Sequence, residues 1–376
     1  MDNKAGSLVK NLSGELTYYS FKPTPLPPEL NYSKPLLSKI IDANKIVGAL
    51  DALSLRIPNI NLYISMYVRK EALLSSQIEG TQCTLEDLFS EENINTNLDV
   101  SDVINYIKAL DYGIERMDSL PLCNRLIKEI HKILLSNTRG EDKNPGEFRT
   151  SQNWIGGAGC SLRNARYIPP NVEDMTIAMS DLEKFINNED SIDPLVKAAL
   201  IHYQFETIHP FLDGNGRIGR LLIILFLIDR KILSKPVLYI SYFLKLNRIE
   251  YYDRMSEIRR NGDYEQWIMF FLEAVEQAAR DGIATIDKLV ALHDKNMHLI
   301  YNKSNNLRVR NFLPYIENNP IIDIRKTASA FNIAYNTASK LISTYESLGI
   351  LANTGYADKS RIYSYVEYLE ILKSGT

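Results

Sequence analysis

One twelve-residue segment, His209 to Arg220 (HPFLDGNGRIGR), constrains the fold of this chain more than any other. The residues before it place apolar side chains at helical spacing, so we expect a helix that ends at His209. Pro210 disfavours helical geometry at His209 and stops that helix. The run from Leu221 to Ile228 is apolar throughout, which predicts a second helix, buried on nearly all sides. The segment is therefore predicted to be a loop between two helices.

This loop has the chemistry of an anion site. The dipeptides Asp213-Gly214 and Asn215-Gly216 contain glycines that reach positive φ without a steric penalty, so backbone amides can approach a ligand closely. The N-terminus of the second helix adds unpaired N–H groups and the positive end of its dipole. Arg217 and Arg220 lie three residues apart in its first turn and share one face. Two arginines oppose the dipole unless an anion is present, so we predict a triphosphate site.

The segment resembles the core motif of the Fic family, HPFx(D/E)GNGRxxR, and every specified position is filled. The resemblance implies a mainly α fold, a Fic-type helical bundle with a β-hairpin flap. It also implies a protein adenylyltransferase, an AMPylator that moves AMP from ATP to a Tyr, Thr or Ser hydroxyl of a protein, itself included. His209 would take the proton from that hydroxyl, a role suited to a side chain whose ordinary pKa is about 6.5.

The same resemblance assigns the nucleotide contacts. Asp213 would hold Mg²⁺ against the α- and β-phosphates of ATP, because a hard cation prefers carboxylate oxygen. Relatives that phosphorylate typically carry lysine at position 216, so a glycine there favours AMP transfer. Without a ligand, the alternative interpretation is a capped buried helix preceded by a solvated turn. The residues expected to contact the nucleotide in the loop are Asp213, Gly214, Asn215, Gly216, Arg217 and Arg220, the last on the terminal phosphate.

A second motif lies far upstream, in residues 75–80 (SSQIEG). A helix is predicted to end at Gly80 in the left-handed conformation, which leaves Glu79 at the end where the dipole disfavours negative charge. The segment resembles the Fic inhibitory motif (S/T)xxxE(G/N). The resemblance implies that Glu79 pairs with Arg220 and blocks the productive γ-phosphate position, while Ser75 orients the carboxylate. In some relatives this glutamate aligns a water that removes AMP, so reverse de-AMPylation stays open, as does a plain exposed helix end.

Two further segments resemble parts of the Fic nucleotide site. Residues 146–170 resemble the flap, in which Ile155 and Gly156 would lie beside the nucleotide and pair with the main chain of the target. A plain surface hairpin is the alternative. Tyr251 and Tyr252 offer a flat wall for the adenine, although packing in the core is nearly as good an explanation.

Composition narrows the class of protein without identifying it. The chain has 376 residues and a formal net charge of −3, which argues against a generally basic surface that coats nucleic acid. Its three cysteines are widely spaced and form no metal pattern, as in a reducing compartment. No secretory signal stands at the start, and Leu221–Ile228 is too short to span a bilayer. We therefore expect a cytoplasmic protein with no membrane contact.

The positions of the prolines and of the polar segments along the chain predict four regions. Residues 1–36 are expected to form an extended arm, and residues 37–120 a helical region that contains the inhibitory helix. Residues 121–301 would be the Fic core, ending in a long helix. Residues 302–376 read as a winged helix-turn-helix, with a helix over 325–331, another over 336–348 and two strands. Strands are expected only in the flap and in the wing.

The winged-helix pattern keeps a second class of function open. The chain could be a transcription regulator that binds DNA through this unit and uses its Fic-like body as a sensor. From Lys303 to Arg361 the basic surplus is mild, which favours a docking or dimer-supporting role over DNA binding. Family members with this layout often pair, so the resemblance also implies a homodimer.

Overall fold

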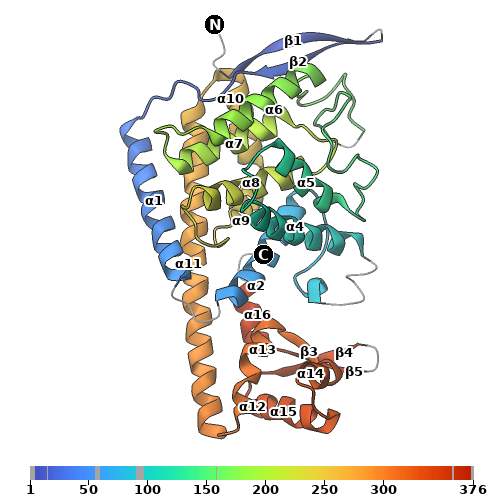
Figure 1. Ribbon diagram of the computed structural model, residues 1–376, viewed down its shortest axis with the longest axis vertical. Coiled ribbons are helices and arrows are strands. Elements are labelled where there is room, and N and C mark those ends of the chain that lie inside the picture. Colours follow the sequence, from blue (N-terminus) through green and yellow to red (C-terminus); the bar gives the residue numbers. More distant parts are fainter. Residues whose placement is uncertain are drawn as a thin grey trace.

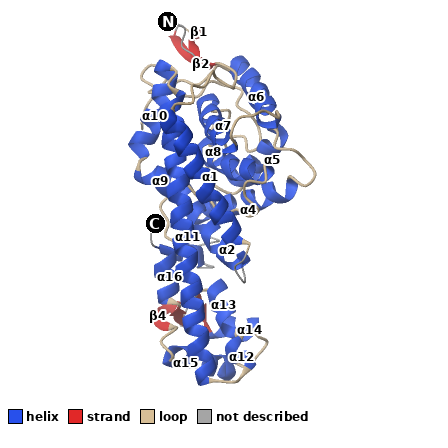
Figure 2. Ribbon diagram, turned by 90° about the vertical axis from the view of Figure 1, so that its left-hand side faces the viewer, coloured by secondary structure: helices blue, strands red, loops and turns tan. Residues whose placement is uncertain are grey.

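The computed structural model describes residues 5–14, 16–55, 60–89, 97–157, 159–357 and 360–373. Helices dominate this part of the chain, and small antiparallel sheets lie at its two ends (Figures 1 and 2). The mainly α class expected from the sequence is confirmed. The helices are α1 (Lys34–Ser54), α2 (Ile60–Ile78), α4 (Leu98–Arg116), α5 (Asn124–Leu135), α6 (Val172–Asn187), α7 (Pro194–Ile208), α8 (Asn215–Asp229), α9 (Ser241–Leu246), α10 (Arg248–Asn261), α11 (Tyr264–Lys303), α12 (Leu307–Arg310), α13 (Phe312–Asn318), α14 (Ile324–Ala330), α15 (Tyr335–Ser347) and α16 (Val366–Lys373), with a 3-10 turn at Glu86–Phe89.

Helices α7 and α8 form the centre of the larger part of the molecule. They pack against each other, α6 and α11 cover α7, and α4, α5 and α2 cover α8. The stretch Leu221–Leu227 is buried on every side, as its unbroken apolar sequence predicts. The loop that joins α7 to α8 is therefore held between two helices whose positions are fixed by the core.

Helix α11 is the longest element. Its 40 residues span about 60 Å at the α-helical rise, and in Figure 1 it runs down almost the whole molecule. Helix α1 packs along its first half, whereas α12 and α16 contact its second half. One continuous helix thus joins the larger part of the molecule, which contains α1 to α10, to the C-terminal unit, which contains α12 to α16 and strands β3 to β5.

The N-terminal region differs from the extended arm that its prolines suggested. Strands β1 (Gly6–Ser13) and β2 (Leu16–Pro23) pair antiparallel, from Gly6 opposite Pro23 to Ser13 opposite Leu16. The prolines stand at or after the end of β2, so none removes a hydrogen-bond donor from the interior of the ladder. The expectation that strands occur only in the flap and the wing was therefore wrong. Residues 1–4 of the predicted arm lie outside the described residues.

The C-terminal unit contains a three-stranded sheet. Strand β5 (Ser360–Ser364) lies between β3 (Ile321–Asp323) and β4 (Ala352–Ala357), with α14 and α15 packed together beside it. The helices predicted over 325–331 and 336–348 occur within one residue of those bounds. Strand β3 and helix α16 were not predicted, and α16 packs back on α11 and α2. The winged-helix assignment of this unit stays a prediction.

Across the described residues, the structure contains no helix whose apolar stretch is long enough to cross a membrane.

Candidate active site

His209 caps α7 in an unusual backbone conformation. Its φ of 50° and ψ of 61° place it in the left-handed region, which a non-glycine residue seldom adopts. Its N–H still donates to the Phe205 carbonyl at 2.9 Å, and its own carbonyl accepts from Arg149 Nε at 3.0 Å and Asn153 Nδ2 at 3.1 Å. The conformation is therefore held from both sides, by the end of α7 and by two side chains of the segment after α5.

The His209 ring is arranged to act as a base. Its Nδ1 faces the Glu206 carbonyl at 3.3 Å, which assigns the ring proton to Nδ1 and leaves Nε2 as an acceptor. Burial lowers the pKa of His209 to about 4, and the charges of Arg149 and Arg259 act in the same direction, against the Glu206 carbonyl and the Glu79 carboxylate. The imidazole is therefore neutral at pH 7 and able to accept a proton.

The loop after His209 is braced by its own side chains. Asn215 Oδ1 accepts from the Phe211 N–H and its Nδ2 donates to the Phe211 carbonyl, both at 2.9 Å. The Phe211 ring stacks on His131, with ring centres 3.7 Å apart, and His131 Nε2 contacts the Asp213 carbonyl at 3.0 Å. Both polar atoms of the Asn215 side chain are thus bonded within the loop. The phosphate contact predicted at this residue would therefore have to come from its backbone N–H.

Helix α8 begins without a side-chain cap. Gly214 occupies the cap position at a φ of 76°, and its N–H donates to Asp213 Oδ1 at 2.6 Å. The Asp213 side chain is 45% exposed at the mouth of the loop. Among the described residues no group of three or more His, Cys, Asp or Glu side chains is placed to hold a metal ion. A single accessible carboxylate fits Mg²⁺, which keeps several waters and commonly binds one or two carboxylates plus substrate phosphates.

Arg217 forms a buried ion pair that the sequence did not reveal. Its Nη1 donates to Asp102 Oδ1 at 2.8 Å, and the two side chains are 6% and 9% exposed. Its Nη2 lies 3.8 Å from Asp213 Oδ1. Asp102 comes from α4, 115 residues earlier, so no local spacing connects the two positions. The guanidinium is thereby fixed between the core and the predicted metal ligand.

Arg220 meets the predicted inhibitory segment. Its Nη2 donates to Glu79 Oε1 at 2.8 Å and to the Ser75 carbonyl at 2.8 Å, while its Nε donates to Ser75 Oγ at 2.7 Å. Burial pushes the pKa of Glu79 up, but the charge and hydrogen bond of Arg220, helped by Arg217, hold it below its ordinary value. Glu79 is therefore ionised at neutral pH. Ser75 was expected to orient the Glu79 carboxylate, and the structure instead places its hydroxyl on Arg220.

At two glycines of α8, the absence of a side chain lets a carboxylate lie close to the helix backbone. A β-carbon on Gly216 would lie 2.1 Å from Glu79 Oε1, and one on Gly219 would lie 2.3 Å from Glu206 Oε1. Gly80, which follows Glu79, has a φ of 101°, the positive value predicted for the end of that helix. Close approach of Glu79 to the first turn of α8 therefore depends on the missing side chain at position 216.

Glu206 is a buried acid at the site that the sequence analysis overlooked. It lies one turn before His209 on α7, it is 7% exposed, and its Oε1 has no hydrogen-bond partner among the described residues. Burial raises its pKa to about 8, and the Glu79 charge adds to that shift while Arg220 opposes it. Glu206 is therefore mainly protonated at pH 7. A signal was available, since Glu206 is the one acid in the sequence of α7, most of which is apolar.

Among its described residues, the predicted flap contains one antiparallel residue pair in place of two strands. Ile155 and Tyr167 exchange backbone hydrogen bonds of 2.8 and 3.1 Å. The Tyr167 hydroxyl donates to the Thr207 carbonyl at 2.7 Å, and the Arg259 guanidinium lies 4.0 Å from its ring centre. Gly156, next to Ile155, is exposed. The base of the flap is thus anchored to the end of α7, beside His209.

The two tyrosines proposed as an adenine wall have different environments. Tyr251 is 1% exposed, its hydroxyl lies 2.8 Å from His202 Nε2, and its ring packs near Trp267. Tyr251 is therefore a core residue in this structure, and the stacking role expected for it is not available. Tyr252 is half-buried, with its ring 4.9 Å from that of Tyr251, and its role stays a prediction.

Two regions of the chain match family models. Residues 121–227 match the Fic/DOC family, and residues 37–115 match the Fic/DOC family N-terminal region. The loop between α7 and α8 lies inside the first match and Glu79 inside the second. These two regions of the chain therefore belong to the Fic/DOC family.

Curated relatives carry the name Protein adenylyltransferase Fic. The one from Culex quinquefasciatus is 32% identical over 185 residues, which are 49% of this chain and 33% of the relative. The one from Drosophila mojavensis is 30% identical over 209 residues, which are 53% of this chain and 38% of the relative. The chain thus spans between a third and two fifths of the length of these two proteins.

Solved structures share the fold. A Fic family protein from Desulfovibrio desulfuricans G20 superposes with a TM-score of 0.57 at 19% identity, over 90% of this chain and 98% of that one. Fic-1 from C. elegans gives a TM-score of 0.51 at 21% identity, over 67% of this chain and 74% of that one. At these identities the likeness establishes the arrangement of the helices.

Proposed function

We propose that this protein is an autoinhibited protein adenylyltransferase that transfers AMP from ATP to a Tyr, Thr or Ser hydroxyl of a protein, itself included. One observation carries the proposal. The neutral imidazole of His209 stands at the end of α7, while the uncapped start of α8 and Arg220 lie across the same short loop. Relatives named Protein adenylyltransferase Fic, 32% and 30% identical over the matched region, support the reaction class.

The chemical step follows from the free nitrogen of His209. Nε2 accepts the proton of the target hydroxyl while the hydroxyl oxygen forms a bond to the α-phosphorus of ATP. The bond from that phosphorus to the oxygen bridging to the β-phosphate breaks, and pyrophosphate leaves. The Glu206 carbonyl keeps the ring proton on Nδ1 and so directs Nε2 at the substrate. Phosphoryl chemistry leaves little covalent work to the protein, so positioning and charge supply most of the rate.

The start of α8 supplies the phosphate contacts in this proposal. The backbone N–H groups of Asn215 and Gly216, in its first turn, have no acceptor within the helix, and the helix dipole favours an anion there. Asp213 would hold Mg²⁺, which neutralises phosphate charge when bound. Arg217, fixed by Asp102, places a second cation beside that carboxylate.

Glu79 is the inhibitory element of the proposal. It occupies Arg220 and lies against Gly216, where the terminal phosphate would otherwise contact the guanidinium. ATP must therefore bind in a different position or displace the carboxylate. The same carboxylate could align a water for removal of AMP, so the reverse reaction is part of the proposal.

The experiment uses ATP labelled at the α- or the γ-phosphate, with Mg²⁺ and a cell lysate. AMP transfer marks protein from the α-labelled nucleotide only, whereas phosphorylation marks it from the γ-labelled one. His209→Ala should abolish the mark. Salt-sensitive binding to duplex DNA with no labelling from either nucleotide would instead favour a transcription regulator.

A further inference from the structure

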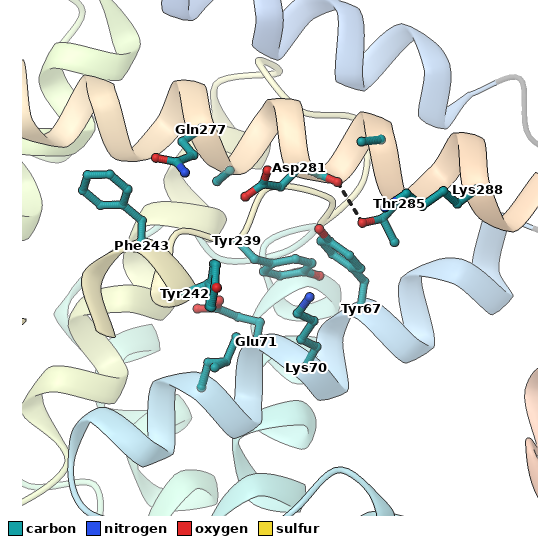
Figure 3. Close-up of a pocket in the computed structure, with 13 residues that line it drawn as sticks. Tyr67, Lys70, Glu71, Tyr239, Tyr242, Phe243, Gln277, Asp281, Thr285 and Lys288 are labelled. Atoms are coloured by element: carbon teal, nitrogen blue, oxygen red, sulfur yellow. Dashed lines mark hydrogen bonds between the residues drawn. The ribbon is translucent and has the colours of Figure 1, made fainter. Parts of the chain in front are cut away.

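A cavity outside the site described above lies between α2, α9 and α11. Its volume is about 360 Å³, within the range of small-molecule sites. Figure 3 shows the Lys70 side chain extending from α2 into this space beneath α11, between Tyr242 and Tyr67. The floor is buried, whereas Gln277, Asp281 and Lys288 on α11 are exposed at the rim.

The floor of the cavity combines one cation with aromatic faces. Lys70 is 8% exposed, and its Nζ lies 5.6 Å from the ring centre of Tyr67 and 5.9 Å from that of Tyr242. Tyr239 packs on Tyr67 with ring centres 5.4 Å apart. Burial lowers the pKa of Lys70 to about 8, against the attraction of Asp281. A buried ammonium among flat rings favours an anion that is attached to a flat ring of its own.

The neighbouring acid does not neutralise this cation fully. Glu71 accepts hydrogen bonds from the N–H and hydroxyl of Ser241, and from the Tyr106 hydroxyl at 3.4 Å. Burial raises its pKa to about 7, so it carries only part of a negative charge at neutral pH. Asp281 and Lys288 at the rim carry opposite signs. Glu71 is therefore engaged by Ser241 and Tyr106, and the walls around Lys70 are aromatic.

We propose that this cavity binds a small aromatic anion, with its carboxylate or phosphate on Lys70 and its ring against Tyr67 and Tyr242. The ligand would also be a negative effector of AMP transfer, a clause that depends on the function proposed above. Helix α2 carries Lys70 and Leu74 into the cavity and ends at Ile78, one residue before Glu79. The cavity is formed in the conformation in which Glu79 holds Arg220, and a ligand stabilises the conformation that it binds.

Binding is tested first, without nucleotide, by titration calorimetry of the full chain with 2-naphthoate at neutral pH. We expect a dissociation constant on the order of 1 mM or tighter. The uncharged 2-naphthamide and the saturated decahydronaphthalene-2-carboxylate should bind at least about tenfold more weakly. No binding of 2-naphthoate, or equal binding of the three compounds, would overturn the site.

Variants separate the roles of the cation and the ring. Lys70→Met and Tyr242→Leu should each weaken the binding of 2-naphthoate by about tenfold or more. Lys45→Met, at an exposed position on α1, serves as the matched control and should leave binding unchanged. Circular dichroism of each variant verifies that it folds. Should Lys70→Met fold and bind as wild type does, the assignment of the cation is wrong.

Coupling is then measured as incorporation of label from α-labelled ATP. Saturating 2-naphthoate should lower labelling by the wild-type chain and have little effect on Glu79→Gly, which lacks the inhibitory contact. Binding without any effect on wild-type labelling would refute the effector role and leave the site standing. If neither form labels protein under any condition, the proposed function fails, while the calorimetric result is untouched.

Discussion

The carboxylate of Glu79 and the missing side chain of Gly216 share one space, because a β-carbon at position 216 would lie 2.1 Å from Glu79 Oε1. The glycine that opens the start of α8 to a phosphate therefore also admits the group proposed to block it. Substitutions at the two positions should therefore be interdependent.

Glu79→Gly should raise AMP transfer strongly. If the Glu79 carboxylate, paired with Arg220, leaves about 1% of molecules able to bind ATP productively, its removal raises the rate by up to roughly a hundredfold. The measurement is initial rate of incorporation from α-labelled ATP. Glu189→Gly, which removes an exposed acid of the loop between α6 and α7, is the control. A rate equal to that of wild type would contradict the inhibitory role.

Gly216→Ala should activate the wild-type chain without any change at Glu79. The added methyl group displaces the carboxylate, which is the end of a flexible side chain and moves at small cost. In the Glu79→Gly background the same substitution should bring no further gain. The two rates give a double-mutant cycle. Additive activation would show that Gly216 and Glu79 act separately.

The rate of AMP transfer should be nearly independent of pH on the acid side of neutrality. A base is active when it is neutral, and burial holds the pKa of His209 near 4. An ordinary imidazole, with a pKa of about 6.5, would lose about tenfold of kcat/KM between pH 7.5 and pH 5.5. The profile is best recorded with Glu79→Gly, with circular dichroism at each pH to verify folding. A tenfold fall over that interval would exclude a His209 that stays neutral down to pH 5.5.

Glu206→Gln should change how stability depends on pH. The folded chain keeps the Glu206 proton up to about pH 8, whereas the unfolded chain releases it near its ordinary pKa of 4.5. The unfolded state therefore binds fewer protons in this window, and the free energy of unfolding falls as pH rises through it. Glutamine removes that contribution. In urea denaturation, the free energy of unfolding of the variant should therefore rise relative to that of wild type from pH 4.5 to pH 8. Parallel curves would show that Glu206 ionises normally.

Asp102→Asn should destabilise the fold by about 3–5 kcal/mol, because it leaves the buried charge of Arg217 without its partner. Asp174→Asn breaks a pair with Lys22, whose side chain is 50% exposed, and should cost much less. Urea denaturation of the two variants gives the comparison. Equal losses would mean that Arg217 is satisfied by other groups.

The sequence predicted the parts of the site that are local in the chain. The end of α7 at His209 and the start of α8 follow from Pro210, the paired glycines and the apolar run after them. The pairing of Arg220 with Glu79 came from a resemblance, since 141 residues separate them. No pattern could reveal Asp102 or the use of the Ser75 hydroxyl by Arg220, because tertiary packing alone selects those partners.

The errors in the sequence analysis share a physical cause. Proline content suggested an extended N-terminal arm, yet the prolines lie where they spare the ladder between β1 and β2. Adjacent tyrosines suggested a wall for adenine, yet successive residues of a helix point in different directions, and Tyr251 turns into the core. Composition and adjacency say little about which face of an element is buried.

The continuity of α11 limits how this protein can be shortened. Its last third is covered by α12, by α16 and by contacts such as Asn296 to the Tyr365 hydroxyl. A truncation after Lys303 would keep the helix and strip its cover, leaving Leu292 and Ile300 in water at a cost of about 1.5–3 kcal/mol each. A cut made within α11, ahead of Leu292, would remove the cover together with the part of α11 beneath it and would expose only the surface of α2 that α13 and α16 contact, so it is the better starting point for a shortened chain.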